Sequence, residues 1–255
     1  MITIISPAKT LDMETPVNSP SQSEPVFLNK SKQLVSVLKK KKASELSQLM
    51  GISPKLAQLN FERFQEWATP YNVEKTRPAV FAFRGEVFTS LDIDTFSEKD
   101  INYTQNHLCI LSGLYGLLRP MDSILAYRLE MGTKLSIGKK KNLYEFWGDE
   151  ITNYLNEALA HQKDDILINL ASNEYYKSIN PKKLKAKVYT PVFKDNKNGQ
   201  YKVISFFAKK ARGHMLRFIL KKQISKPTDL KYFEEDGYYF NDSLSNKNTF
   251  TFTRG

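Results

Sequence analysis

The chain has 255 residues, of which 41% are hydrophobic, 12% aromatic and 25% charged; its 38 basic against 27 acidic residues give a formal net charge of +11. A single cysteine cannot form an intramolecular disulfide, and the longest apolar stretch is too short to span a bilayer. Met1–Thr10 lacks the basic start of a secretory signal, and the glycine and proline counts are ordinary. These features favour a cytoplasmic protein and exclude disulfide scaffolds, membrane spans and collagen-like chains.

Strands and helices are predicted to alternate along the whole chain. Apolar, β-branched runs predict strands at 1–5, 79–83, 107–111, 165–170, 188–193, 201–206 and 249–253. Helical spacing predicts helices at 31–67 (with breaks), 94–106 and 144–161, and a helix of about four turns that follows residue 206. Residues 12–25 predict a surface loop, and residues 112–120 a glycine-bearing loop that begins a helix. We therefore predict a mixed α/β (α+β) fold, with a central mixed sheet flanked by helices in one compact domain over residues 1–255.

The segment 43–66 is similar to a helix-hairpin-helix. A helix at 44–50 is followed by Gly51-Ile52-Ser53 and by a second helix from Pro54. Gly51 suits the positive φ that ends a helix, Ser53 can cap the next one, and exposed amides at its start favour a phosphate. Ser53 stands where the second glycine of the motif is usual, so the stretch is equally compatible with an ordinary helical corner.

The excess positive charge is concentrated in residues 177–226, which hold 15 basic residues and one acid, a net of +14. Within the expected helix an apolar face is predicted from Phe207, Ala211, Met215 and Phe218. Lys210, His214, Arg217 and Lys221 recur at helical spacing and form a basic stripe. Because like charges at that spacing repel, a DNA backbone is one partner that would offset them; a solvated lysine face is the other interpretation.

Three loops that follow predicted strands carry candidate site residues: Ser6–Thr10 with Lys9, 112–120 with Arg119, and 169–179 with Glu174. Polar residues at strand ends commonly line α/β clefts, which makes Glu174 the preferred carboxylate if there is chemistry. A satisfied network of loop hydrogen bonds is the competing interpretation for each loop. The pair His107 and Cys109 lacks further ligands, so we expect no metal site.

Several strings together closely resemble the YaaA family of bacterial peroxide-stress resistance proteins, from Met1 to about Phe240. They are ISPAKTLD, FRGEVFTSLDIDTFSEKD, LSGLYGLLRPMD, YRLEMG, LYEFWGDEIT, INLASNEYYKSI, TPVFKDNKNGQYKVISFFAKKARG and GYYF. The resemblance implies a cytosolic protein that protects cells from hydrogen peroxide and limits free iron and DNA damage. It also implies one compact mixed α/β fold with a basic cleft and a helix-hairpin-helix that binds duplex or branched DNA.

The family strings, the hairpin and the basic helix together supply the predicted site residues. Family members often have Lys at the position of Arg84, which keeps the charge but changes hydrogen-bond geometry. The candidate catalytic residues are Lys9, Glu130 and Glu174. The expected DNA contacts are Lys9, Gly51, Ser53, Lys55, Arg84, Arg119, Arg128, Lys209, Lys210, Arg212, Arg217 and Lys221.

Two functions therefore compete. The leading prediction is a DNA-binding protein of the peroxide-stress response without sequence specificity. The alternative is an enzyme that acts on a nucleotide or damaged DNA base in the same cleft, with Arg119, Arg128 and Asn169 beside the candidate catalytic residues. Direct iron sequestration is disfavoured by the lack of clustered ligands. No cofactor and no membrane partner are expected; the oligomeric state stays open, with a monomer favoured.

Overall fold

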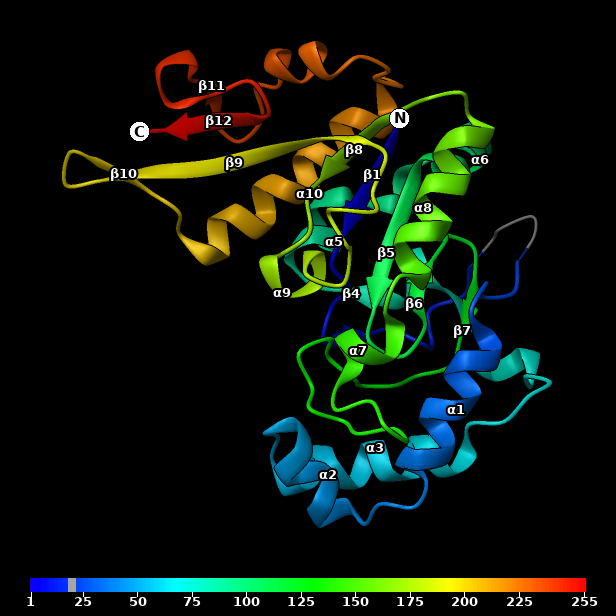
Figure 1. Cartoon of the computed structure of the whole chain (residues 1–255). Helices are drawn as coiled ribbons and strands as arrows, with labels where there is room; N and C mark the ends of the chain where they lie inside the picture. Colours follow the sequence, from blue (N-terminus) through cyan, green and yellow to red (C-terminus); the bar gives the residue numbers. More distant parts are fainter. Residues whose placement is uncertain (18–21) are drawn as a thin grey trace.

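A mixed sheet lies at the centre of the computed structural model, which describes residues 1–17 and 22–255 (Figure 1). Its strands lie in the order β11-β12-β9-β8-β1-β5-β6, and β10 pairs with β9. The five strands from β12 to β5 pair in parallel, whereas β6, β10 and β11 pair antiparallel with their neighbours. The strand bounds are β1 Ile2–Ile5, β5 Leu108–Ser112, β6 Gly116–Leu118, β8 Ile166–Asn169, β9 Lys187–Lys197, β10 Gln200–Lys202, β11 Tyr239–Phe240 and β12 Thr249–Arg254.

The central strands are continuous apolar runs because both of their faces are covered. Every residue of β1 and every residue of β5 is buried. Strands of parallel sheets that are covered on both faces have this composition. Ile4 pairs with Cys109 on one side and with Asn169 on the other, which fixes the register of the three strands. The sheet and its parallel core confirm the predicted mixed α/β class.

Helices cover this sheet and extend the molecule at one end. α10 packs against α5, α6 and β9, and α2 packs against α3. Figure 1 shows α1, α2 and α3 at the opposite end of the molecule from β9 and β12. The helix bounds are α1 Leu28–Leu38, α2 Ala43–Met50, α3 Pro54–Glu66, α4 Ala79–Ala82, α5 Glu86–Leu91, α6 Glu98–His107, α7 Leu143–Trp147, α8 Glu150–His161, α9 Asn173–Tyr176 and α10 Ser205–Lys221, with 3-10 turns at Val73–Lys75, Ile93–Thr95, Pro227–Tyr232 and Asp242–Leu244.

The connections diverge between two neighbouring strands, β1 and β8. The chain that leaves β1 reaches β5 on one side of β1, whereas the chain that leaves β8 passes through α9 and reaches β9 on the other side. In open α/β sheets, ligands bind outside the carboxyl ends of strands at such a switch point. The loops that follow Ile5 and Asn169 therefore occupy the position that this architecture offers to a ligand.

Two predicted elements adopt a different structure because short apolar runs do not distinguish strand from buried helix. Residues 79–83 were expected as a strand, but Ala79–Ala82 forms a buried helical turn and only Phe83 enters a strand, β4 (Phe83–Arg84). Residues 112–120 do not begin a helix. Gly116 has a φ of +69° and lets the chain return as β6 against β5.

Two further predictions need new boundaries. The expected helix at 144–161 is interrupted at Gly148, whose φ of +50° separates α7 from α8. The expected strand at 201–206 is replaced by the shorter β10, which the Asn198-Gly199 turn folds back on β9, and α10 already begins at Ser205. Part of the loop expected at 12–25, including Pro20, lies outside the described residues.

The buried face of α10 also differs from the predicted one. Ala211 and Met215 are fully buried as expected, but Phe207 is 36% exposed. The face that packs on α5 and the sheet includes Ala208, Leu216 and Ile219 instead. No helix within residues 1–17 and 22–255 is long and apolar enough to cross a membrane.

Candidate functional site

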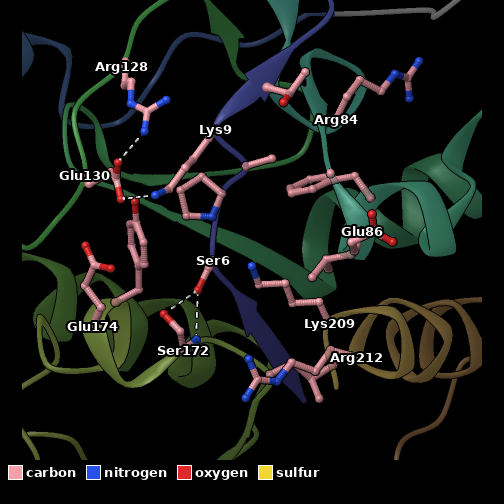
Figure 2. Close-up of a pocket in the computed structure, with 18 of the residues that line it drawn as sticks. Ser6, Lys9, Arg84, Glu86, Arg128, Glu130, Ser172, Glu174, Lys209 and Arg212 are labelled. Carbon is pink, nitrogen blue, oxygen red and sulfur yellow. Dashed lines mark hydrogen bonds and ion pairs between the residues drawn. The ribbon is translucent and has the colours of Figure 1, made fainter. Parts of the chain in front are cut away.

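A pocket of about 460 Å³ lies at the carboxyl ends of β1 and β8, at the switch point of the sheet (Figure 2). We call it the switch-point pocket. Its apolar part comes from Leu129, Leu170 and the rings of Phe88, Tyr127 and Tyr175. Its charged lining residues are Lys9, Arg84, Glu86, Arg128, Glu130, Glu174, Lys209 and Arg212.

Hydrogen bonds join the two loops that leave β1 and β8. The Ser172 backbone N–H donates to Ser6 Oγ at 2.9 Å, and the Ser6 hydroxyl donates to Ser172 Oγ at 3.2 Å. The Leu170 N–H donates to the Ile4 carbonyl oxygen at 3.0 Å, which extends the strand pairing to the end of β8. Ser6 and Ser172 thus hold together two segments that are 166 residues apart.

The first loop is also held against the segment that carries Arg84. Thr10 and Leu11 form the short strand β2, which pairs with β4 so that Thr10 lies opposite Arg84. At Gly85 a Cβ atom would approach the Ala8 Cβ to 3.0 Å, so glycine permits this close approach. Arg84 is neutralised by ion pairs with Asp94 at 3.1 Å and Asp12 at 3.5 Å.

The two candidate catalytic residues Lys9 and Glu130 meet in one ion cluster at the pocket wall. Lys9 Nζ lies 3.0 Å from Glu130 Oε2, and Arg128 donates to Glu130 Oε1 at 2.9 Å (Figure 2). The Lys9 side chain is 64% exposed, whereas Arg128 is mostly buried. The cluster carries a net charge of +1 and keeps a cation at the pocket opening.

The third candidate, Glu174, lies at the start of α9 in the same wall. Its Oε1 accepts a hydrogen bond from the Gly132 N–H at 2.9 Å. Its backbone carbonyl accepts one from the Tyr144 hydroxyl at 2.9 Å, which ties α9 to α7. The structure therefore brings Lys9, Glu130 and Glu174 together around one cavity, although they come from three distant segments.

Two tyrosines form the inner wall between these charges. The Ser112 and Tyr127 hydroxyl groups lie 2.6 Å apart, and burial raises the pKa of Tyr127 well above its ordinary value. Burial also raises the pKa of Tyr175, with a further contribution from the negative charge of Glu174. Both phenols are therefore neutral at physiological pH, and both serve as apolar, aromatic wall.

Helix α10 contributes the cations on the far side of the pocket. Figure 2 shows Lys209 and Arg212 extending from this helix toward Ser6 and Ser172. Burial lowers the pKa of the Arg212 guanidinium. At Gly213 a Cβ atom would lie 2.6 Å from the Ser90 Cβ and closer still to the Val87 carbonyl oxygen. Glycine at this position allows the contact between α10 and α5 that sets the direction of Arg212.

The predicted basic stripe of α10 lies beside a different depression, next to α5 and α6. His214, Arg217 and Lys221 line that depression. Arg217 donates to the carbonyl oxygens of Leu91 and Asp92, both at 2.9 Å. The repulsion between the cations of the stripe is therefore offset by groups within the molecule. That repulsion is no longer an argument for a DNA partner.

Two more of the predicted cations have intramolecular roles. Lys221 Nζ lies 2.6 Å from the Asp100 carboxylate, and Lys210 Nζ lies 5.1 Å from the centre of the Phe206 ring. Arg119 lies outside the switch-point pocket; it donates to the buried Asp122 carboxylate at 2.9 Å and to the Glu24 carbonyl.

The turn expected at residues 51–53 is present, with a local geometry that a helix-hairpin-helix and an ordinary helical corner share. α2 ends at Gly51, whose φ is +61°, and α3 starts with Pro54. The Ser53 hydroxyl accepts a hydrogen bond from the Leu56 N–H at 3.4 Å. Lys55 is exposed in the first turn of α3.

A second depression, of about 630 Å³, connects this hairpin to the switch-point pocket. We call it the hairpin depression. Gln48–Gly51 line it on one side and Gly132, Thr133 and Lys134 on the other. Lys9, Arg128, Glu130 and Glu174 line both cavities. The hairpin turn and the pocket thus belong to one continuous groove.

No group of three or more His, Cys, Asp or Glu residues in the described part of the chain has the geometry to hold a metal ion. His107 Nδ1 lies 2.8 Å from the Met1 carbonyl oxygen, and Cys109 is buried. Asn169 is not a lining residue of the pocket, because its side chain accepts a hydrogen bond from the Ala171 N–H.

Among the pocket residues that sequence reasoning missed, two are polar, Glu86 and Tyr127. Glu86 begins α5 two positions after Arg84 and enters the pocket because Gly85 approaches the first loop. Tyr127 lies one position before Arg128. Their only signal was their place in FRGEVF and YRLEMG, the same strings that carry Arg84 and Arg128.

Comparisons with known proteins cover the whole chain. Residues 1–244 match the sequence family described as peroxide stress protein YaaA. A UPF0246 protein of Aliivibrio fischeri (strain MJ11) is 52% identical over 254 residues, which cover 100% of this chain and 98% of that relative. A UPF0246 protein of Shewanella oneidensis (strain MR-1) is 53% identical over 254 residues, which cover 100% and 99%. The motif-based resemblance is confirmed: this chain belongs to the peroxide stress protein YaaA family, in which these relatives carry the name UPF0246.

Proposed function

We propose that this member of a peroxide-stress family binds duplex or branched DNA, without sequence specificity, through the groove formed by the switch-point pocket and the hairpin depression. The proposed role includes limiting free iron and the DNA damage that iron causes, as the family resemblance implies. The observation that carries the DNA-binding proposal is the continuity of the groove, since four residues line both of its parts.

The chemistry of the groove supports a polyanionic partner. Lys9, Arg128 and Lys134 lie along it, and the Gly51 turn lies at its outer end. Lys55 stands beside that turn in the first turn of α3, where exposed backbone N–H groups and the helix dipole favour a phosphate. Contacts of this kind hold the DNA backbone and carry no base sequence.

The test measures equilibrium binding of a fluorescent duplex and a four-way junction at low salt. Lys55→Glu and Lys134→Glu each replace an exposed cation of the groove or its hairpin end, and each should weaken binding by about tenfold or more. Lys99→Glu is the matched control, because Lys99 is exposed on α6, away from the hairpin (Figure 1). Equal affinities of the three variants, or absence of binding by the wild type, would contradict the proposal.

A second candidate function is catalysis on a nucleotide or a damaged base in the same pocket. The observation that favours it is the meeting of Lys9, Glu130 and Glu174 at a sheet switch point. Glu174 would act as the acid–base group, because its second carboxylate oxygen faces no hydrogen-bond donor among the described residues. Incubation of damaged-base oligonucleotides with wild type and Glu174→Gln tests this function; absence of product from wild type argues for binding alone.

A further inference from the structure

Two cations of the switch-point pocket, Lys209 and Arg212, have no polar partner in the part of the chain that the structure describes. Neither Lys209 nor Arg212 makes a side-chain hydrogen bond or ion pair with any residue in 1–17 or 22–255. Arg212 is only partly accessible, and burial disfavours its charge. A desolvated charge without a counter-charge is costly, so an arginine kept in this state is suited to an anion that enters the pocket. The other pocket cations already have acidic partners: Arg84 pairs with Asp94, and Lys9 and Arg128 share Glu130.

The rest of the pocket is suited to a ring with hydrogen-bond donors. The rings of Phe88, Tyr127 and Tyr175 contribute an aromatic wall. Glu174 uses one carboxylate oxygen for the Gly132 N–H and leaves the other free to accept. Ionised carboxylates only accept hydrogen bonds, so they select ligands with N–H or O–H groups. Figure 2 shows Glu174 on the opposite side of the Ser6–Ser172 contact from Lys209.

We propose that the switch-point pocket binds a single nucleotide unit, with its phosphate on Lys209 and Arg212 and its base against the aromatic wall near Glu174. The cavity of about 460 Å³ is in the range of small-molecule sites. The unit comes either from a free nucleotide or from a nucleotide extruded from DNA, and the phosphate and base contacts are the same in both cases. Only the DNA-borne source rests on the proposed function.

Calorimetric titration with dGMP, deoxyguanosine and inorganic phosphate tests the free source. We expect dGMP to bind at least about tenfold more tightly than deoxyguanosine, because only dGMP brings the charge-assisted hydrogen bonds. Lys209→Gln and Arg212→Gln should each weaken dGMP binding by about tenfold and leave deoxyguanosine binding unchanged. Lys222→Gln, an exposed cation at the end of the same helix, is the matched control and should behave as wild type.

A duplex with one 2-aminopurine tests the DNA-borne source, because the fluorescence of this base rises when it is unstacked. We expect a rise on binding by wild type and Lys222→Gln, and a smaller rise with Arg212→Gln at saturating protein. Since Lys209 is exposed, Lys209→Gln gives the same comparison in a variant whose fold depends little on the substituted side chain.

The outcomes separate this inference from the proposed function. Binding of dGMP without duplex binding supports the nucleotide pocket and contradicts DNA binding. Duplex binding with neither dGMP binding nor a 2-aminopurine signal overturns the nucleotide pocket and leaves DNA binding standing. Two further outcomes overturn the nucleotide pocket. One is equal affinity of the wild type for dGMP and deoxyguanosine. The other is that Lys209→Gln and Arg212→Gln leave both the dGMP affinity and the 2-aminopurine signal unchanged.

Discussion

Individual side chains of this protein have functions that their neighbours in sequence do not share. Lys209 and Lys210 are adjacent, yet Lys209 lines the switch-point pocket while Lys210 lies over the ring of Phe206. Arg128 and Arg119 both come from strings typical of the family, yet Arg128 lines the groove and Arg119 stabilises the buried Asp122. Residue type alone therefore does not assign a cation to the site.

The sole cysteine is expected to be inert toward peroxide, although the protein belongs to a peroxide-stress family. Cys109 is 5% exposed in β5, and burial raises the pKa of its thiol to about 12. Only the thiolate reacts with peroxide, and at neutral pH the folded protein holds almost none. Mass spectrometry after treatment with hydrogen peroxide should therefore show unmodified Cys109 in native protein and oxidised Cys109 after unfolding in guanidinium. Stoichiometric oxidation of the native thiol would refute this.

Gly213→Ala is expected to destabilise the protein, although the residue lies within a helix. Alanine at an exposed helix position stabilises by about 1 kcal/mol relative to glycine. At Gly213 the added methyl group would overlap the Val87 carbonyl oxygen and the Ser90 side chain, and overpacking of this kind costs about 1–3 kcal/mol. Denaturant unfolding should show a lower free energy of unfolding for Gly213→Ala, and an increase would contradict the close contact between α10 and α5.

At the scale of elements, α10 is the part that connects the site to the core. One of its faces holds Ala211 and Met215 in the core, and Lys209 and Arg212 point from it into the pocket. Arg217 attaches its second half to the end of α5 through Leu91, and Lys221 attaches it to α6 through Asp100. The helix can therefore present two cations to a ligand because several other contacts fix its position.

The contact between Lys221 and Asp100 predicts a specific loss of stability in acid. The hydrogen bond from Lys221, together with those from Ser97, lowers the pKa of Asp100 from 3.8 to about 2. A carboxyl group whose pKa is lowered by folding stabilises the native state above its unfolded pKa, and this stabilisation is lost as the pH falls through the folded value. Lys221→Met should therefore lower the free energy of unfolding by a constant amount above about pH 5, and the difference should shrink toward pH 2. Lys222→Met is the control, and a pH-independent difference for Lys221→Met would contradict the prediction.

At the scale of the whole molecule, four of the 15 basic residues in 177–226 form ion pairs with acids from other segments. Lys183 pairs with Asp149 at 2.6 Å, Lys187 with Asp165 at 2.9 Å and Lys221 with Asp100 at 2.6 Å. The net charge of +14 in residues 177–226 therefore overstates what a partner would meet there. The groove, with its residues from both ends of the chain, is the more selective indicator of a polyanion site.

The salt dependence of DNA binding is expected to report which cations contact phosphates. Each cation that displaces a condensed counterion from duplex DNA adds about 0.9 to the slope of log K against log salt. Lys55→Gln should therefore reduce the magnitude of the slope by about 0.9, whereas Lys99→Gln should leave it unchanged. Titrations at several salt concentrations with duplex DNA give the slopes, and equal slopes for the two variants would exclude Lys55 from the DNA contact.

Several local elements and site residues of this protein could be predicted from its sequence alone. The buried strand Ile2–Ile5 and the Gly51 and Ser53 turn follow from local backbone preferences, which neighbouring residues suffice to set. The family strings also marked Lys9, Glu130 and Glu174 as site residues, and all three line the pocket.

Only the tertiary structure decided which charges remain available to a ligand. Lys9 and Glu130 are 121 positions apart, and Lys221 and Asp100 are separated by the same number, yet each pair forms one ion pair. Whether a cation is paired depends on acids that long-range packing brings near it, and no local pattern encodes that packing. Arg212 is left without an acid because Gly213 lets α10 lie directly against α5, which directs the guanidinium into the pocket.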